Sequence, residues 1–244
     1  MRTNDMYDAD FFRSQRDGSI RSATVIVPLV ETLIKPASVV DIGCGTGGWL
    51  SVFADRGVRD IAGLDGDYVD ASMLRFPLES FRAADLSWPF TFERTFDLAM
   101  SLEVGEHLPP SSAAAYVDSL TRLSDVVLFS AAVPFQGGKQ HVNEQWPDYW
   151  ARLFEARGFV CFDCIRKRIW SNPDVQWWYA QNILLFVRAP SVERYSALAG
   201  LEPANPESLP VVHPRSYLLL AQDFYGEDGY RDGMIVGRKF TPRI

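Results

Sequence analysis

The sequence is poor in cysteine, in histidine and in positive charge. Its three cysteines are odd in number and badly placed for a disulfide framework, so we expect a reducing, cytoplasmic location. Lys and Arg number 24 against 31 Asp and Glu, and no basic block offsets the net charge of −7. Because phosphate-backbone binding needs a concentrated basic face, DNA is not expected as a substrate.

The sequence also lacks long apolar runs. None reaches the roughly 18 residues that a membrane-spanning helix needs, so no membrane span is expected. The first 22 residues are too polar and charged for a secretory signal. The hydrophobic fraction of 47% is nevertheless ample for one large core.

Strand and helix signals alternate from about residue 20 to residue 190. The predicted strands are Ser38–Ile42, Asp60–Leu64, Phe81–Ala84, Phe96–Ser101 and Val126–Ala131. The predicted helices are Ala23–Ile34, Gly47–Arg56, Tyr68–Leu74, Ser111–Leu123 and Trp146–Ala156. Such alternation predicts an α/β domain with a doubly wound, mostly parallel sheet.

The pattern changes after residue 158. Residues Phe159–Trp170 and Asn182–Arg188 are predicted to be two strands with no helix between them. The pair Cys161 and Cys164 has the spacing of a metal or redox motif. Residues three apart on a strand point to opposite faces, so we interpret them as two ordinary cysteines.

The most informative segment is Ser38–Leu50, a strand followed by a glycine-rich turn and a helix. Asp41 stands two positions before the first glycine, which places bare backbone and one carboxylate where adenosine-type ligands bind. This segment resembles the first motif of the class I S-adenosylmethionine-dependent methyltransferases, Asp/Glu-x-Gly-x-Gly-x-Gly. The matching positions are Asp41, Gly43, Gly45 and Gly47.

The same glycines also satisfy Gly-x-Gly-x-x-Gly, the fingerprint of domains that bind NAD or FAD. A dinucleotide places its pyrophosphate against this turn, where the Asp41 carboxylate would repel it. S-adenosylmethionine carries a cationic ammonium and sulfonium instead, so the charge of Asp41 favours that cofactor. A nicotinamide oxidoreductase remains the alternative.

Further acidic residues follow the next strands. Asp65 closes the second strand and is predicted to accept hydrogen bonds from the ribose hydroxyls, with Asp67 beside the adenine. The resemblance implies that Asp85 and Leu86, after the third strand, contact the adenine, and Glu103 is also assigned to the cofactor. Helix or turn caps are the alternative interpretation of these acids.

The candidate chemistry follows the fourth and fifth strands. Glu103, Glu106 and His107 would project from one face if they form a helical turn, and His141 follows the next strand. In one interpretation His107 or His141 is a general base, with Glu106 beside it. In a second, all four bind a divalent cation such as Mg²⁺, Mn²⁺ or Co²⁺. In a third, they only cap a helix or hold a loop.

The pattern Glu-x-x-Glu-His with a downstream His resembles the small-RNA 3′-end 2′-O-methyltransferases and, more loosely, the ubiquinone-pathway O-methyltransferases. For the acceptor we predict contacts with Asn143, Trp146, Trp177 and Trp178, the last two in a loop, because exposed rings stack on sugars or flat heterocycles. Gly137 and Gly138 are predicted to let the loop before His141 move.

The resemblance to a bacterial class I methyltransferase covers about residues 22–187 and implies a Rossmann-like, seven-stranded sheet with an antiparallel last strand. It divides the chain into an N-terminal lid or loose segment (1–21), a methyltransferase domain (22–188) and a C-terminal extension (189–244). The extension is expected to pack on the core or on another subunit of a homo-oligomer.

The expected function is O-methylation of a small polyhydroxylated acceptor, such as a sugar or glycoconjugate, in glycan biosynthesis. N-methylation of a small heterocycle is one alternative. A non-catalytic module that binds S-adenosylmethionine is another.

Overall fold

The computed structural model describes the backbone of residues 9–225 and the side chains of residues 18–222. Seven strands form one sheet in the order β3-β2-β1-β4-β5-β7-β6. The strands are β1 (Ser38–Ile42), β2 (Asp60–Asp65), β3 (Phe81–Ala83), β4 (Leu98–Leu102), β5 (Val126–Ser130), β6 (Phe159–Phe162) and β7 (Leu184–Arg188). β7 is antiparallel to both of its neighbours, and the other pairs are parallel. The predicted fold class is confirmed.

The central strands are buried on both faces. All five residues of β4 and all five of β5 are buried, as expected for continuous apolar strands in a parallel sheet with helices on both sides. Strand order reverses beside β1, where Asp41 lies opposite Gly63 of β2 and Met100 of β4. Ligands of doubly wound sheets bind at such a switch point.

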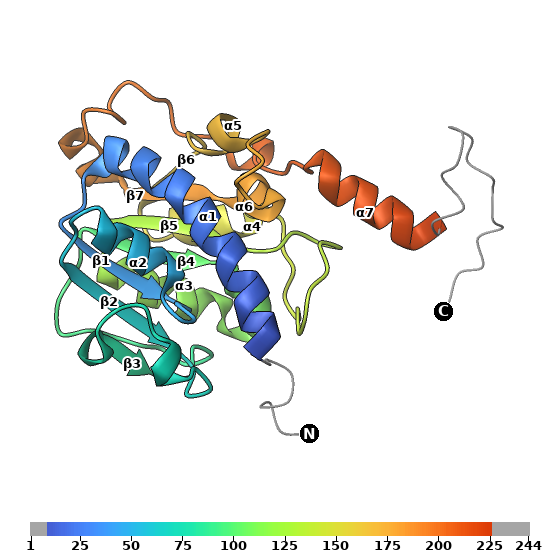
Figure 1. Cartoon of the computed structure of the whole chain (residues 1–244). Helices are drawn as coiled ribbons and strands as arrows, with labels where there is room; N and C mark the ends of the chain where they lie inside the picture. The colour runs from blue at the N-terminus through green and yellow to red at the C-terminus, as the bar shows by residue number, and fades with distance from the viewer. Residues whose placement is uncertain (1–8, 226–244) are drawn as a thin grey trace.

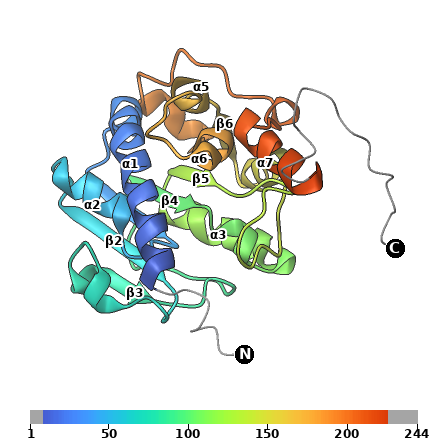
Figure 2. The ribbon, with the colours of Figure 1, turned by 45° about the vertical axis from the view of Figure 1, so that its right-hand side comes forward.

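Helices cover both faces of the sheet (Figures 1 and 2). They are α1 (Ala9–Ile34), α2 (Gly48–Asp55), α3 (Ala113–Leu123), α4 (Pro147–Glu155), α5 (Arg166–Ile169), α6 (Trp177–Asn182) and α7 (Pro214–Tyr225). α1 and α2 pack in one core cluster and α3 and α4 in the other. On α1 the buried residues Ala23, Val27, Val30 and Ile34 recur at helical spacing.

The first helix is longer than predicted. It begins at Ala9 rather than at Ala23, so it continues through the polar segment that was expected to be a lid or loose. Gly18 leaves room for the Gln176 side chain, and the Ser22 hydroxyl accepts a hydrogen bond from the Gln176 backbone N–H at 3.0 Å. These contacts come from a residue far along the chain. The lid function itself stays a prediction.

Three other element predictions were wrong. Residues Tyr68–Leu74 contain only a short 3-10 turn, Ala71–Met73, which the Asp70 side chain caps by accepting from the Ser72 N–H. The strand predicted over Phe159–Trp170 ends at Phe162. Two short helices, α5 and α6, lie before β7, so Trp177 and Trp178 are helical rather than in a loop.

The segment after β7 runs back over the domain before α7 projects from its side (Figure 1). Ala204 N–H donates to the Cys161 carbonyl, and His213 N–H donates to the Gln181 side-chain oxygen. Residues 226–244 of the predicted extension lie outside the described residues. Within residues 9–225, no helix combines the length and the apolar composition needed to cross a membrane.

Candidate active site

A cavity of about 1140 Å³ opens at the carboxyl ends of β1, β2 and β4. The glycine turn after β1 lines one part of it, and the loop between β5 and α4 lines another. Ser19 of α1 and Trp177, Trp178 and Tyr179 of α6 complete the wall. Pockets for drug-sized ligands reach about 1000 Å³, so a nucleoside cofactor and a small acceptor fit together.

Asp41 lies in β1 with its carboxyl group buried at the cavity. Burial, and then the charge of nearby Asp65, raise the pKa of Asp41 to about 8. A cationic group of a ligand at this position would restore the ionised form. The structure therefore places a carboxylate where the motif predicts one, in an environment that favours a positive partner.

Asp65, the last residue of β2, is held by three donors. Its carboxylate accepts from the Gly45 N–H at 2.6 Å, the Gly66 N–H at 2.7 Å and the Tyr68 hydroxyl at 2.5 Å. Burial raises the pKa of Asp65, and these hydrogen bonds act in the opposite direction. The carboxylate thus joins the glycine turn to β2 at the edge of the cavity.

The three glycines of the turn differ in what surrounds them. A Cβ on Gly43 would lie 2.3 Å from Val104, and one on Gly47 would lie 2.2 Å from Phe76. A Cβ on Gly45 would meet no atom within 4 Å. Only Gly45 therefore leaves its bare backbone open to a ligand, whereas the other two leave room for the protein's own side chains.

The remaining predicted cofactor residues also line the cavity: Asp67, Asp85, Leu86 and Glu103. Asp85 lies two residues beyond the end of β3, one residue further than the predicted strand Phe81–Ala84 implies. Its carboxylate accepts from the Ser87 N–H at 2.9 Å, so it also caps a turn.

The sequence suggests one helical turn for Glu103, Glu106 and His107, but Glu103 lies outside the turn that carries the other two. It follows β4 with a φ of 57°, and the 3-10 turn begins only at Gly105. Its carboxylate accepts from Asn182 Nδ2 at 3.1 Å and from Gln136 Nε2 at 2.9 Å. Burial raises the pKa of Glu103 to about 7, and these amide donors oppose the rise.

Glu106, His107 and His141 form the second part of the site. One ligand atom from each lies within 4.8 Å of the others. Within the described part of the chain, neither carboxylate oxygen of Glu106 has a hydrogen-bond partner, and neither has His107 Nδ1, although all three atoms are buried. Burial and the Glu103 charge raise the pKa of Glu106. Burial and then His141 lower the pKa of His107 to about 4.

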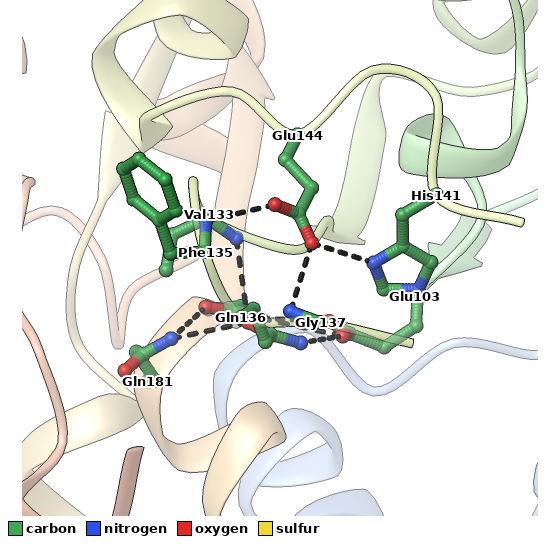
Figure 3. A network of polar contacts seen from close by, with 9 residues as sticks. Glu103, Val133, Phe135, Gln136, Gly137, His141, Glu144 and Gln181 are labelled. Atoms are coloured by element: carbon green, nitrogen blue, oxygen red, sulfur yellow. Dashed lines mark hydrogen bonds and ion pairs between the residues drawn. The ribbon is translucent and has the colours of Figure 1, made fainter. Parts of the chain in front are cut away.

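His141 is oriented by Glu144, a residue that sequence reasoning missed. His141 Nδ1 lies 2.9 Å from Glu144 Oε1 (Figure 3). The only sequence signal was a carboxylate three residues after a histidine. Gln136 and Asn182, the partners of Glu103, were also missed, because only the fold brings them together.

The predicted acceptor residues divide into two groups. Trp177 and Trp178 line the cavity from α6. Asn143 is buried elsewhere, with Nδ2 3.4 Å from the Gly105 carbonyl, and Trp146 stands before α4 outside the cavity lining. Asn143 thus supports the turn that carries Glu106 and does not reach the cavity.

The donor set of the Glu106 group fits a divalent cation. One carboxylate and two imidazoles, without thiolate, form a mixed oxygen and nitrogen donor set that suits first-row divalent cations such as Mn²⁺ or Co²⁺ better than Mg²⁺, which prefers oxygen ligands. Buried polar atoms without partners are rare in native proteins, and an ion is one of the groups that satisfy them. Glu103 is engaged with amide donors, so three of the four predicted ligands come together.

Cys161 and Cys164 form no site of this kind. Both are free thiols, and Cys161 is buried in β6. Burial raises the pKa of Cys164 to about 11. The interpretation as two ordinary cysteines agrees with these environments.

Comparison with known families and proteins gives two sequence matches for this chain. A family described as methyltransferase domain matches residues 12–163, more than half of the chain. The ribosomal RNA large subunit methyltransferase E of Caulobacter sp. (strain K31) is 55% identical over 31 residues. That match covers 13% of this chain and 14% of the relative, so the chain spans a small part of that protein.

Solved structures share the fold at low identity. The methyltransferase domain of a bacterial Hen1 protein has a TM-score of 0.50 at 18% identity, covering 68% of this chain and 98% of that chain. Magnesium protoporphyrin IX methyltransferase of Synechocystis PCC 6803, with bound S-adenosylhomocysteine, has 0.51 at 18%, covering 72% and 87%. An O-methyltransferase family protein of Burkholderia thailandensis has 0.52 at 12%, covering 75% and 60%.

Proposed function

Because this chain belongs to the family of class I S-adenosylmethionine-dependent methyltransferases, we propose that it methylates a hydroxyl group of a small polyhydroxylated acceptor, such as a sugar or glycoconjugate. The observation that carries this proposal is the group Glu106, His107 and His141. It presents buried lone pairs without partners inside the cofactor cavity. A hydroxyl must lose its proton to become a nucleophile, and these are the groups that would assist it.

We propose that residues at the edge of the sheet, where the strands end, bind the cofactor. Asp65 would accept from the ribose hydroxyls, Asp41 would face the methionyl ammonium, and the open backbone at Gly45 would lie against the ligand. Asp67, Asp85 and Leu86 would border the adenine. Glu103 is assigned to the wall between cofactor and acceptor, since its carboxylate lines the cavity while amide donors hold it.

The charge of the cavity supports a cationic cofactor over a dinucleotide. Six carboxylate residues line it: Asp41, Asp65, Asp67, Asp85, Glu103 and Glu106. Among its described lining residues, Lys139 is the one Lys or Arg. Wherever these carboxyl groups ionise they would repel a pyrophosphate or a phosphate-rich acceptor, whereas a cationic ligand would favour their ionised form. An uncharged, hydroxyl-bearing acceptor avoids that repulsion.

Glu106, His107 and His141 would hold a divalent cation, which when bound lowers the pKa of a hydroxyl and orients its oxygen. In the transfer itself, the acceptor oxygen would bond to the methyl carbon as the carbon–sulfur bond breaks, and the electron pair of that bond would stay on sulfur in the neutral thioether. With the cation on Glu106, His107 and His141, the hydroxyl proton would leave to solvent; without it, an imidazole of this group would accept the proton. Positioning by the cavity walls, including Trp177 and Trp178, supplies much of the rate enhancement.

Calorimetric titration tests the cofactor first. S-adenosylhomocysteine and NADH are titrated into the protein, its Asp65→Ala variant and Asp55→Ala, an exposed acid outside the cavity. We expect S-adenosylhomocysteine to bind and NADH not to bind. Asp65→Ala should weaken the affinity for S-adenosylhomocysteine at least about tenfold, which is about 1.4 kcal/mol of binding free energy. Asp55→Ala should leave that affinity unchanged. Binding of NADH instead would remove the basis of the proposal.

An acceptor screen with and without EDTA tests the chemistry. We expect transfer to oxygen that falls on chelation and returns with Mn²⁺ or Mg²⁺. Activity that survives His107→Ala and His141→Ala together would instead favour N-methylation of a small heterocycle, which needs no strong base. Cofactor binding without turnover on any acceptor would favour the non-catalytic module.

A further inference from the structure

The loop that carries His141 is bent in an unusual way. It leaves β5 and reaches α4, and four of its residues have a positive φ: Phe135 (67°), Gly137 (72°), Gly138 (152°) and Gln140 (60°). Two of these have side chains, for which the left-handed region costs about 1–2 kcal/mol each. Such a backbone persists only where surrounding contacts hold it.

The carboxylate of Glu144 supplies such contacts to Phe135 and Gly137. Its Oε2 accepts from the Phe135 N–H at 2.8 Å, and its Oε1 accepts from the Gly137 N–H at 2.9 Å. The same Oε1 lies 2.9 Å from His141 Nδ1 (Figure 3). The histidine side chain is only 12% exposed and the glutamate 20%. One carboxylate therefore fixes the loop and the ring together.

The chemistry of this hydrogen bond selects one form of the imidazole. An ionised carboxylate only accepts hydrogen bonds, so the proton of neutral His141 lies on Nδ1 and Nε2 keeps its lone pair. The ring also lies over Gly138, where a Cβ would come within 2.3 Å of Nε2. Glycine at 138 thus leaves the space that this ring orientation needs.

We propose that Glu144 is a positioning residue: it holds His141 as the Nδ1–H tautomer and aims the bare Nε2 at the cation shared with Glu106 and His107. Carboxylates that orient metal-binding histidines in this way are common around metal sites. The part of this proposal that concerns the cation rests on the function proposed above, whereas the part that concerns the His141 tautomer does not.

Removal of Glu144 is expected to release the N–H groups of Phe135 and Gly137 but to leave the loop anchored at Gln136. There Gln136 donates to Glu103 and accepts from Gln181 Nε2 at 3.1 Å and Asn182 Nδ2 at 2.8 Å. These bonds are independent of Glu144. They also provide a matched variant, because Gln136→Ala weakens the loop without touching the hydrogen bond to His141.

The experiment compares the full-length protein with Glu144→Ala, Gln136→Ala and Glu155→Ala, an exposed glutamate of α4. Long-range ¹H–¹⁵N correlation spectra of metal-free protein at pH 8.5 report which imidazole nitrogen carries the proton. His141→Gln assigns the signal. We expect Nδ1–H in the wild type and in both control variants, and a shift towards Nε2–H in Glu144→Ala alone.

Binding of Mn²⁺ alone, measured by the loss of the free-ion electron paramagnetic resonance signal, is the second readout. We expect about 10- to 100-fold weaker binding in Glu144→Ala and a smaller change in Gln136→Ala. An unchanged tautomer in Glu144→Ala, or equal loss of Mn²⁺ affinity in the two loop variants, would overturn the inference. If the tautomer behaves as expected but the wild type binds no Mn²⁺, the proposed cation site is wrong, whereas the positioning of His141 by Glu144 is supported.

Discussion

The two glutamates Glu103 and Glu106 beside the cavity differ in what holds them, and this separates their roles. Glu103 accepts from the side chains of Gln136 and Asn182. Glu106 is fully buried, and among the described residues neither of its oxygens has a hydrogen-bond partner of normal geometry, although the backbone N–H groups of Glu106 and Ala132 lower its pKa. An unpaired buried carboxyl costs free energy, commonly 1–3 kcal/mol or more. A ligand that binds the Glu106 carboxylate would offset this cost.

Gly45 provides a prediction at the scale of one residue. Gly45→Ala places a methyl group in the open space of the cavity at a φ of 53°. The backbone strain should lower the free energy of unfolding by about 1–2 kcal/mol, and the methyl group should reduce S-adenosylhomocysteine affinity at least about tenfold. Urea unfolding and calorimetry measure the two effects separately.

Gly57→Ala is the matched control. Gly57 also has a positive φ, 103°, and also has no atom within 4 Å of a built Cβ, but it lies outside the cavity. It should lose at least as much stability, because its φ lies further from the region open to alanine, and keep its affinity. Equal ligand affinity in the two variants would mean that the open face of Gly45 does not meet the cofactor.

At the scale of elements, Arg166 joins segments that are distant in sequence. Its side chain is 2% exposed and contacts Asp163 through two hydrogen bonds. It also donates to the carbonyls of Gln181 in α6 at 3.0 Å and of Leu209 in the tail at 2.9 Å. The start of α5, the end of α6 and the returning tail therefore share one guanidinium.

Arg166→Met is expected to destabilise the protein strongly. It leaves two buried carbonyls without donors, so the free energy of unfolding should fall by about 2–4 kcal/mol. Arg94→Met removes an exposed arginine paired with Asp60, and surface pairs contribute about 0–1 kcal/mol. Guanidinium unfolding curves of both variants provide the comparison. Similar losses would show that Arg166 is not a structural anchor.

The same residue explains why part of the fold was not predictable from sequence. The central parallel strands β4 and β5 were predictable because each is an almost continuous apolar run, and such runs are typical of sheets buried on both faces. Phe159–Trp170 begins with such a run, but it then carries four charged residues, and the buried Arg166 must turn its guanidinium towards Asp163, Gln181 and Leu209. That requirement comes from tertiary contacts and ends the strand at Phe162.

The candidate site shows the same division. Asp41, Gly45 and Asp65 were predictable because a short motif places them at the ends of adjacent strands. Glu144 and Asn182 were not, because their importance lies in hydrogen bonds to His141 and Glu103. A positive φ at Glu103, which separates it from Glu106, left no signal in residue type either.

At the scale of the whole molecule, negative charge is concentrated where the ligand would bind. The chain carries a net charge of −7, and six carboxyl groups line its main cavity, of which Asp41, Asp65 and Glu106 are buried. Burial removes hydration from these three groups, which raises their pKa values. As the pH rises, the free energy of unfolding should therefore fall while the affinity for a cationic ligand increases.

Asp41 makes this trade measurable. Its pKa in the folded protein is about 8, against 3.8 for the ordinary group. A carboxyl with a raised folded pKa favours the folded state at low pH, and that contribution is lost as the pH rises from about 4 to about 8. Asp41→Asn removes the ionisation, so the variant should gain stability relative to the wild type as the pH increases from 5 to 8.

The expected slope is up to about 1.4 kcal/mol for each pH unit in that window. It is measured as the difference in unfolding free energy between wild type and Asp41→Asn, with Asp55→Asn as a control for an exposed acid. In the same window S-adenosylhomocysteine should bind the wild type more tightly as the pH rises, because its ammonium favours the ionised Asp41, and this trend should vanish in Asp41→Asn. Parallel stability curves for wild type and Asp41→Asn would mean that the Asp41 carboxyl ionises normally in the folded protein and exerts no such control on the cofactor.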